Sequence, residues 1–413
     1  MQYTIEDLFQ LSRRYLETKQ KPYHRAFLKT HPFKHRLSIL KGQRGTGKTT
    51  LIVQHLLNAA AGNVVSHDIL YIPADHFLLS GRSLYEIAEQ FSLLGGKWIA
   101  FDEIHKYPNW SMELKSIYDT FPSLMVLASG SSALKVHQGS HDLSRRAIVY
   151  SVRGLSFREY LEMTTKATFP VLTLLELLAK HESIAHVIAK QIAGLERKIL
   201  AEFKQYLKMG YYPYFLEMHD FSLYLMTLEQ SVHATLETDL AEIHPELTGN
   251  SLRKIKQLLT FIASHVPFTP NFQQLKGILE IGDERTLKIY FKYLEEAELI
   301  RQLMRSSQKL RKLNIPEKIY LDNTNQLYAI SPAAQNSGTI REIFFANMLS
   351  SQHTLTAPKQ GDFLVDDKMI FEVGGKNKDF NQIKGCTNAY LACDDIEVGI
   401  KHKIPLWLFG FLF

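Results

Sequence analysis

The sequence predicts an α/β protein whose first part is a parallel, doubly wound sheet, and two observations support this prediction. A glycine-rich loop, GQRGTGKTT at 42–50, lies between a short apolar run and a stretch with apolar residues at helical spacing. Further apolar runs follow, mostly separated by helical stretches, and the expected strands are 36–40, 69–73, 97–101, 124–128 and 147–152. Alternating strands and helices are typical of parallel sheets that bind ligands at the carboxyl ends of their strands.

The loop at 42–50 has the Gly-x-x-x-x-Gly-Lys-Thr spacing of a phosphate-binding loop. Its glycines let backbone N–H groups curl around phosphate oxygens, and the start of the next helix adds partial positive charge. Lys48 is expected to reach the β- and γ-phosphates of ATP, and the Thr49 hydroxyl to bind Mg²⁺. The predicted nucleotide-binding residues are Gly42, Arg44, Gly45, Thr46, Gly47, Lys48, Thr49 and Thr50.

The apolar run at 97–101 ends in two carboxylates, Asp102 and Glu103. A strand that delivers two acids at its tip is typical of a Walker B element. Asp102 is expected to hold Mg²⁺, and Glu103 to orient and deprotonate the attacking water. Ser129 and Ser131 follow the next run and are candidates for contact with the γ-phosphate, although Ser-Gly-Ser is also common in turns.

The order of these motifs resembles the AAA+ branch of P-loop ATPases, because a strand at 69–73 separates the loop from the Walker B element. Other segments resemble a large prokaryotic family of AAA-type ATPases that carry a C-terminal domain of unknown function. These are LSFREYLEM (155–163), YLKMGYYPYFLE (206–217), YLDNTNQLYAI (320–330), REIFFANML (341–349) and FEVGGKNKDFNQIKG (371–385).

The resemblance implies an ATPase core, a helical lid, a winged-helix-like module and an α/β domain that resembles the PD-(D/E)xK nuclease fold. The expected divisions are a basic helical region at 1–35, the AAA-type core at 36–155, the lid at 156–250, the winged-helix-like module at 251–330 and the nuclease-like domain at 331–413.

Arg145 and Arg146 directly precede the last predicted core strand. The resemblance implies an arginine finger at this place, which would reach the γ-phosphate of a neighbouring subunit in a homo-oligomer and accelerate hydrolysis. A pair of solvated surface arginines is the alternative.

Composition and charge narrow the classes of protein. The chain has 413 residues, of which 45% are hydrophobic and 22% charged, as in soluble globular proteins. No run of 18 uncharged apolar residues occurs and the first ten residues do not form a signal peptide, so we expect no membrane association. The two cysteines fit a reducing compartment, and we expect a cytoplasmic protein.

The net charge of +6 is unevenly distributed, since residues 1–50 carry +8 and residues 251–312 carry +6. Such segments are a candidate footprint for double-stranded DNA, although solvated helices also carry lysines. In the winged-helix-like module, Arg285, Lys288 and Lys292 share one face of the third helix, as a major-groove reader requires. Binding of a protein partner is the alternative.

The last part of the chain contains a candidate second metal site. The resemblance implies that Glu342, Asp362 and Glu372 would hold Mg²⁺ and that a lysine two residues after the last acid would activate water. Gly374 occupies that position here, and the nearest lysine along the strand is Lys376. An inactive nuclease-like fold used for binding or assembly is therefore expected, and an active nuclease is the alternative.

The motifs together predict a Mg²⁺-dependent ATPase of the AAA type. It would convert ATP to ADP and phosphate and couple this reaction to a conformational change, on DNA or on a protein partner. Two alternatives stay open: an ATP-regulated binding switch with slow turnover, and an ATP-gated DNA nuclease.

Overall fold

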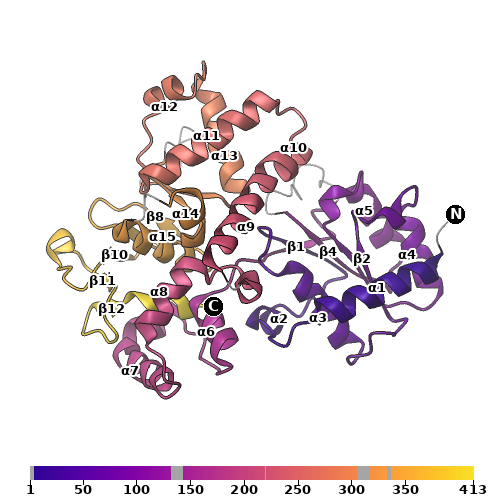
Figure 1. Cartoon of the computed structure of the whole chain (residues 1–413), viewed down its shortest axis with the longest axis horizontal. Helices are drawn as coiled ribbons and strands as arrows, with labels where there is room; N and C mark the ends of the chain where they lie inside the picture. Colours follow the sequence, from indigo (N-terminus) through magenta and orange to yellow (C-terminus); the bar gives the residue numbers. More distant parts are fainter. Residues whose placement is uncertain (1–3, 132–142, 219, 306–315, 333–335) are drawn as a thin grey trace. The chain divides into compact units, whose positions relative to one another are not determined.

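The computed structural model describes residues 4–131, 143–218, 220–305, 316–332 and 336–413. The chain divides into two compact units, which are described separately. The first unit comprises residues 1–154 and 237–247, and the second comprises 155–236 and 248–413. In Figure 1 the first unit is mostly indigo and purple, and the second runs from magenta to yellow. The predicted division into five parts stays a prediction.

The first unit contains a five-stranded sheet with the order β2-β3-β4-β1-β5, and all neighbouring strands are parallel. The α/β prediction is thus confirmed, and each strand lies within two residues of its expected position. The observed strands are β1 (Leu37–Lys41), β2 (Ile69–Pro73), β3 (Trp98–Asp102), β4 (Met125–Gly130) and β5 (Ile148–Ser151). Because β4 lies between β1 and β3, its carboxyl end separates the phosphate-binding loop from the Walker B acids.

Alternating side chains on these strands form two cores, one on each face of the sheet. Leu37 and Ile39 of β1 face one core, and Leu40 faces the other. α4 (Leu84–Leu93) and α5 (Trp110–Thr120) cover the first face, and α3 (Lys48–Ala59) covers the second. Shorter helices of this part are α2 (Ala26–Thr30), η1 (Phe77–Leu79) and η2 (Ile104–Lys106).

The amino-terminal basic region is part of the first unit. α1 (Ile5–Lys19) begins at a capping box, in which Thr4 accepts from the Asp7 N–H and Asp7 accepts from the Thr4 N–H. Leu8 and Leu16 of this helix are buried, and the helix packs against β2 at the sheet edge.

A short segment from much later in the chain completes the first unit. This segment, residues 237–247, begins within the π-helical turn Thr235–Asp239 and contains α10 (Leu240–Ile243). α10 packs against η2, directly after the Walker B acids. Leu240 anchors the segment, since its side chain is fully buried.

The second unit begins with helices that share a buried polar network. The Asn325 amide group donates to the carbonyl groups of Tyr206 and Leu207, and its oxygen accepts from the Tyr211 N–H and the Tyr224 hydroxyl. Two of the segments that carry the family resemblance, 206–217 and 320–330, therefore meet here, and Tyr211 is buried between them. The helices are α6 (Phe157–Thr165), α7 (Leu174–Ala193), α8 (Ile199–Met209), η3 (Pro213–Glu217) and α9 (Phe221–Ala234).

Residues 248–321 have the element order that the sequence predicts, with three helices followed by a strand. A second strand completes an antiparallel pair, β6 with β7. The elements are α11 (Gly249–His265), α12 (Phe272–Ile278), α13 (Glu284–Glu296), β6 (Ile300–Leu303) and β7 (Lys318–Leu321). The winged-helix assignment itself stays a prediction.

The last part of the chain builds a mixed sheet with the order β12-β11-β10-β9-β8. Its strands are β8 (Leu355–Thr356), β9 (Phe363–Val365), β10 (Met369–Gly374), β11 (Ala389–Cys393) and β12 (Lys403–Pro405), and α14 (Thr324–Ile330) and α15 (Ser337–Leu349) precede them. The resemblance to the PD-(D/E)xK fold stays a prediction.

The apolar C-terminal segment at 404–413 is mostly buried, and only its beginning is a strand. The strand ends at Pro405, and 3-10 helices follow at η7 (Leu406–Phe411), as at η6 (Asn381–Ile383) earlier in this part. Gly410 allows η7 to lie close to α6, because a Cβ atom at this position would lie 2.5 Å from the Cβ atom of Phe157. None of the helices in the described ranges is long and apolar enough to cross a membrane.

Candidate functional site

The phosphate-binding loop connects β1 to α3, as the sequence predicts. Gly45 and Gly47 have φ angles of 80° and 93°, which side chains disfavour and which turn the backbone toward the helix. Gly42 has a different role, since a Cβ atom there would lie 2.2 Å from the Val152 carbonyl oxygen. The first N–H groups of α3 have no partner within the helix and can bind an anion.

Two buried cations hold the loop in shape. The Lys48 ammonium group donates to the carbonyl oxygens of Gly42 and Gln43 at 2.9 and 3.0 Å. Arg25 donates to three carbonyl oxygens, those of Thr46 at 3.0 Å, Arg153 at 2.8 Å and Gly154 at 3.0 Å. The loop and the chain after β5 are thereby fixed to the segment before α2.

Asp102 is the centre of the site. Its Oδ2 atom accepts hydrogen bonds from the Thr49 hydroxyl at 2.6 Å and from the Tyr71 hydroxyl at 2.5 Å. Its Oδ1 atom accepts from the Ser129 hydroxyl. Thus β2, β3, β4 and α3 each contribute a side chain to one point at the carboxyl edge of the sheet.

Burial and the Asp102 charge both raise the pKa of Tyr71 far above its ordinary range. The Tyr71 hydroxyl therefore stays protonated near neutral pH and donates its hydrogen bond to the carboxylate.

This donor set fits Mg²⁺. The Thr49 hydroxyl and the Asp102 carboxylate supply hard oxygen atoms close together, which is the kind of ligand that Mg²⁺ prefers. The ion would take few ligands from the protein and share the phosphate oxygens of the nucleotide. The predicted metal ligands, Thr49 and Asp102, are thus adjacent.

Glu103 follows in a left-handed conformation with a φ angle of 53°. Its N–H donates to the Ser129 hydroxyl oxygen at 3.1 Å, which ties the acid to the tip of β4. Its carboxylate is only partly buried, and Oε2 lies 3.7 Å from His105 Nε2. Glu103 is therefore held by its backbone while its side chain faces the site.

The other predicted nucleotide-binding residues have varied surroundings. Ser129 contacts Asp102 and Glu103, and the Ser131 N–H donates to His105 Nδ1 at 3.4 Å. The Thr46 hydroxyl donates to the Gln43 carbonyl at 2.9 Å, within the loop. Gly45 is exposed and Thr50 is partly buried on the first turn of α3.

Arg145 and Arg146 precede β5 at the amino ends of the strands, which is the edge opposite to the phosphate-binding loop. Arg146 forms an ion pair with Asp119 at 2.8 Å, and Arg145 is exposed. The structure therefore does not bring them to the site of their own chain. A role toward a neighbouring subunit stays a prediction.

The acids of the proposed second metal site are each paired within the second unit. Lys318 Nζ lies 3.2 Å from Asp362 Oδ1 and 3.6 Å from Glu342 Oε2. The Tyr320 hydroxyl also donates to Glu342 at 2.7 Å. Burial raises the pKa of Glu342, and the Asp362 charge adds to this increase.

The lysine predicted for that site was wrong. Lys378 Nζ, not Lys376, lies next to the buried Glu372, 2.5 Å from its Oε1 atom. β10 ends at Gly374, and a turn in which the Lys378 N–H donates to the Gly375 carbonyl brings Lys378 back over the strand. Lys376 is exposed, and its carbonyl oxygen accepts from Lys403 Nζ.

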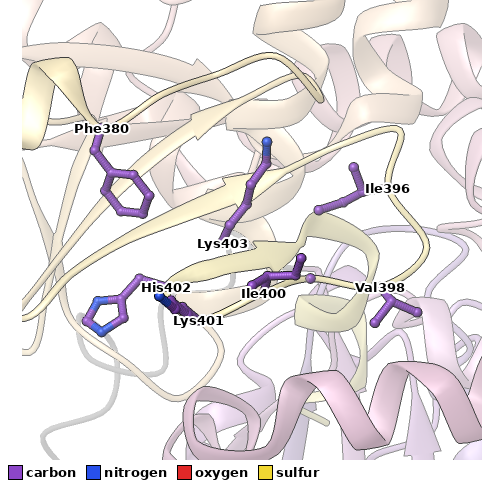
Figure 2. A pocket seen from close by; sticks show the side chains of 8 residues that line it. Phe380, Ile396, Val398, Ile400, Lys401, His402 and Lys403 are labelled. Atoms are coloured by element: carbon purple, nitrogen blue, oxygen red, sulfur yellow. The ribbon is translucent and has the colours of Figure 1, made fainter.

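The second unit also contains an apolar hollow of about 500 Å³. Figure 2 shows Phe380, Ile396 and Val398 around it, together with the residues that lead into β12. The residues that line it include Lys401 and Lys403 but no carboxylate, so it does not offer Mg²⁺ ligands.

Sequence reasoning missed four residues of the first site: Arg25, Tyr71, His105 and Asp239. His105 follows the Walker B acids by two positions, and Tyr71 lies in the predicted second strand, so both had a positional signal. Asp239 had none, because only the return of residues 237–247 brings it to the loop.

Comparison with known proteins adds to this geometry. Residues 34–161 match the family model of the AAA domain. This part of the chain is similar to the AAA domain. The matched residues contain the sheet, the phosphate-binding loop and the Walker B acids. Residues 200–335 match a domain of unknown function, DUF8612.

The similarity to one curated protein extends beyond residues 34–161. An uncharacterized protein of Methanocaldococcus jannaschii is 29% identical over an alignment of 403 positions, which covers 90% of this chain and 82% of that protein. PCH-2 of C. elegans is 18% identical, with a TM-score of 0.26 over 43% of this chain, and the chain spans about half (48%) of its length. AMPPCP-bound DnaA from Aquifex aeolicus is 15% identical, with a TM-score of 0.28 over 66% of this chain and 86% of that chain.

Proposed function

We propose that this protein is a Mg²⁺-dependent ATPase that hydrolyses ATP to ADP and phosphate at the AAA domain. One observation carries the proposal: the Thr49 hydroxyl of the phosphate-binding loop donates to the Asp102 carboxylate of the Walker B element at 2.6 Å. Two motifs that are 53 residues apart in the sequence thus supply the oxygen ligands that one Mg·ATP complex needs.

Each residue has a defined task in this reaction. The loop N–H groups and Lys48 bind the phosphates, for which Lys48 exchanges its contacts with loop carbonyls. Thr49 and Asp102 hold Mg²⁺, which neutralises phosphate charge when bound. Glu103 accepts the proton of the attacking water. Ser129 fixes the Glu103 backbone and so keeps this base at the tip of β3.

Steady-state hydrolysis tests the proposal. The wild-type protein should release phosphate from ATP in the presence of Mg²⁺, and Lys48→Ala should not. Glu103→Gln should bind ATP but lose about 100-fold or more in kcat, because the base is removed while the ligands remain. Glu89→Gln, an exposed acid on α4, is the matched control. A wild-type rate no higher than that of Lys48→Ala, together with tight ATP binding, would instead support the slow binding switch.

The partner on which hydrolysis acts is a separate question, and we infer that it is a protein. On α13, Lys288 pairs with Glu284 at 2.8 Å and Lys292 lies 3.6 Å from Glu296. These intrahelical pairs compensate two of the three cations on the face that DNA recognition would use. Hydrolysis should then be indifferent to double-stranded DNA. Stimulation that disappears as salt is raised would contradict this inference, because phosphate contacts weaken steeply with salt.

We infer that Asp362 and Glu372 of the second unit form structural ion pairs and are not the metal ligands of a nuclease. Lys318 and Lys378 already neutralise Asp362 and Glu372. We therefore expect no Mg²⁺-dependent cutting of DNA with or without ATP. Cutting that is lost in Asp362→Ala would establish the nuclease instead.

A further inference from the structure

Asp239 links the phosphate-binding loop to the residues after the Walker B acids. Its side chain is fully buried, and both carboxylate oxygens accept from Arg44, with Arg44 Nε at 3.1 Å from Oδ2. Arg44 is the third residue of the loop, 195 positions before Asp239. A charge-assisted, two-pronged contact of this kind fixes both orientation and distance.

The same carboxylate faces His105. The Ser131 N–H donates to His105 Nδ1 at 3.4 Å, so the neutral ring carries its proton on Nε2. Nε2 points between two acids, 3.6 Å from Asp239 Oδ1 and 3.7 Å from Glu103 Oε2. The His105 side chain is 1% exposed, and its Nε2 atom makes no hydrogen bond of normal length within the described part of the chain. The ring thus stands between Asp239 and the base.

Asp239 keeps its charge in this setting. Burial by itself would raise its pKa, but the His105 ring at 3.6 Å and the hydrogen bonds from Arg44 lower the pKa of Asp239 well below its usual range. A fixed negative charge therefore lies on the far side of His105 from Glu103.

We propose that Asp239 is a positioning residue for ATP hydrolysis: it orients Arg44 on the loop and holds His105 so that Nε2 faces Glu103. This inference rests on the proposed ATPase function. Asp239 touches neither the phosphates nor the water and acts through these two side chains. Because Asp239 is the last residue of the turn Thr235–Asp239 that follows α9, this proposal makes the turn part of the hydrolytic site.

A bound cation is the competing explanation, since His105, Asp239 and Glu242 each offer a ligand atom within 4.8 Å of one another. The Arg44 guanidinium argues against it, because this cation already occupies both oxygens of Asp239. Glu242 is exposed and belongs to the same segment, which makes it a suitable control.

The test measures kcat and KM for ATP in the wild type, Asp239→Asn, His105→Ala, the double variant and Glu242→Gln, with Lys48→Ala as the blank. Asp239→Asn should lower kcat by about 10- to 100-fold, the range expected when a catalytic group is misplaced. KM should change by less than about threefold, because the loop N–H groups and Lys48 still bind the phosphates. The double variant should be no slower than the slower single variant, because both residues act on Glu103 through one chain of contacts.

Each other outcome overturns a defined statement. A kcat of Asp239→Asn within about twofold of the wild type, or losses that multiply in the double variant, ends the positioning role. An equal loss in Glu242→Gln replaces it with the cation site. A wild type no faster than Lys48→Ala ends the ATPase proposal itself. If Asp239→Asn does not fold, His105→Ala tests the same chain of contacts from Asp239 to Glu103. An unchanged kcat in His105→Ala would then contradict the positioning role.

Discussion

Arg25 should be one of the main stabilising residues of the first unit, although it lies outside every motif. Its guanidinium donates to the carbonyl oxygens of Thr46, Arg153 and Gly154, and the residue is 8% exposed. Replacement by alanine removes three charge-assisted hydrogen bonds. If water replaces each bond in part, at a net loss of about 1 kcal/mol per bond, Arg25→Ala should lower the free energy of unfolding by about 3 kcal/mol.

Urea unfolding followed by tryptophan fluorescence measures this loss. The chain has three tryptophans, and Trp407 is the one in the second unit. In a Trp407→Phe background, the signal from Trp98 and Trp110 reports on the first unit alone. Arg13→Ala is the matched control, because the Arg13 side chain is 55% exposed and pairs with Glu17 on the same helix, a contact worth about 0.3 kcal/mol. A loss in Arg25→Ala within about 1 kcal/mol of that control would refute the reasoning.

Three further variants test other contacts. Burial lowers the pKa of His55 from 6.5 to about 4. As pH falls, the imidazole of the unfolded chain therefore takes up a proton before the folded one does, and the free energy of unfolding of the first unit should fall by about 2 kcal/mol between pH 6.5 and 4. His55→Gln should abolish that loss. Gly42→Ala should weaken ATP-analogue binding about tenfold or more, because the new Cβ atom would lie 2.2 Å from the Val152 carbonyl oxygen. Lys378→Met should destabilise the second unit by about 3 kcal/mol by leaving Glu372 buried without its partner, and Glu372→Gln added to it should restore most of that loss.

Matched controls exist for each of these variants. His24→Gln changes an exposed histidine of the same unit and should leave the pH dependence of stability intact. Gly249→Ala adds a Cβ atom that meets nothing within 4 Å. Lys376→Met removes an exposed lysine two positions before Lys378. Equal effects in a variant and its control would contradict the contact in question.

The sheet and the first site were predictable because their signals are local. The runs at 36–40 and 69–73 are short and mostly apolar, which predicts buried strands from the local sequence alone. The spacing from Gly42 to Thr49 likewise defines the loop without any long-range information. Asp102 and Glu103 follow a buried strand directly, so parallel packing alone brings them to the edge where Thr49 lies.

The remaining features depend on contacts between distant parts of the chain. Lys378 approaches Glu372 only because the chain turns after Gly374, whereas strand periodicity alone favoured Lys376. The 3-10 helix at Leu406–Phe411 has the composition of a strand, and its packing, not its residues, decides its conformation.

Residues 237–247 complete a unit whose other residues end at Gly154, and this has a consequence for how the protein is made. At translation rates of 5–20 residues per second, Asp239 leaves the ribosome roughly 4 to 17 seconds after Gly154. During that interval Arg44 and His105 lack the carboxylate that they share in the finished protein. A fragment that stops at residue 154 would keep them permanently in that condition, so the AAA domain should be expressed alone with a short linker in place of residues 155–236 rather than by truncation.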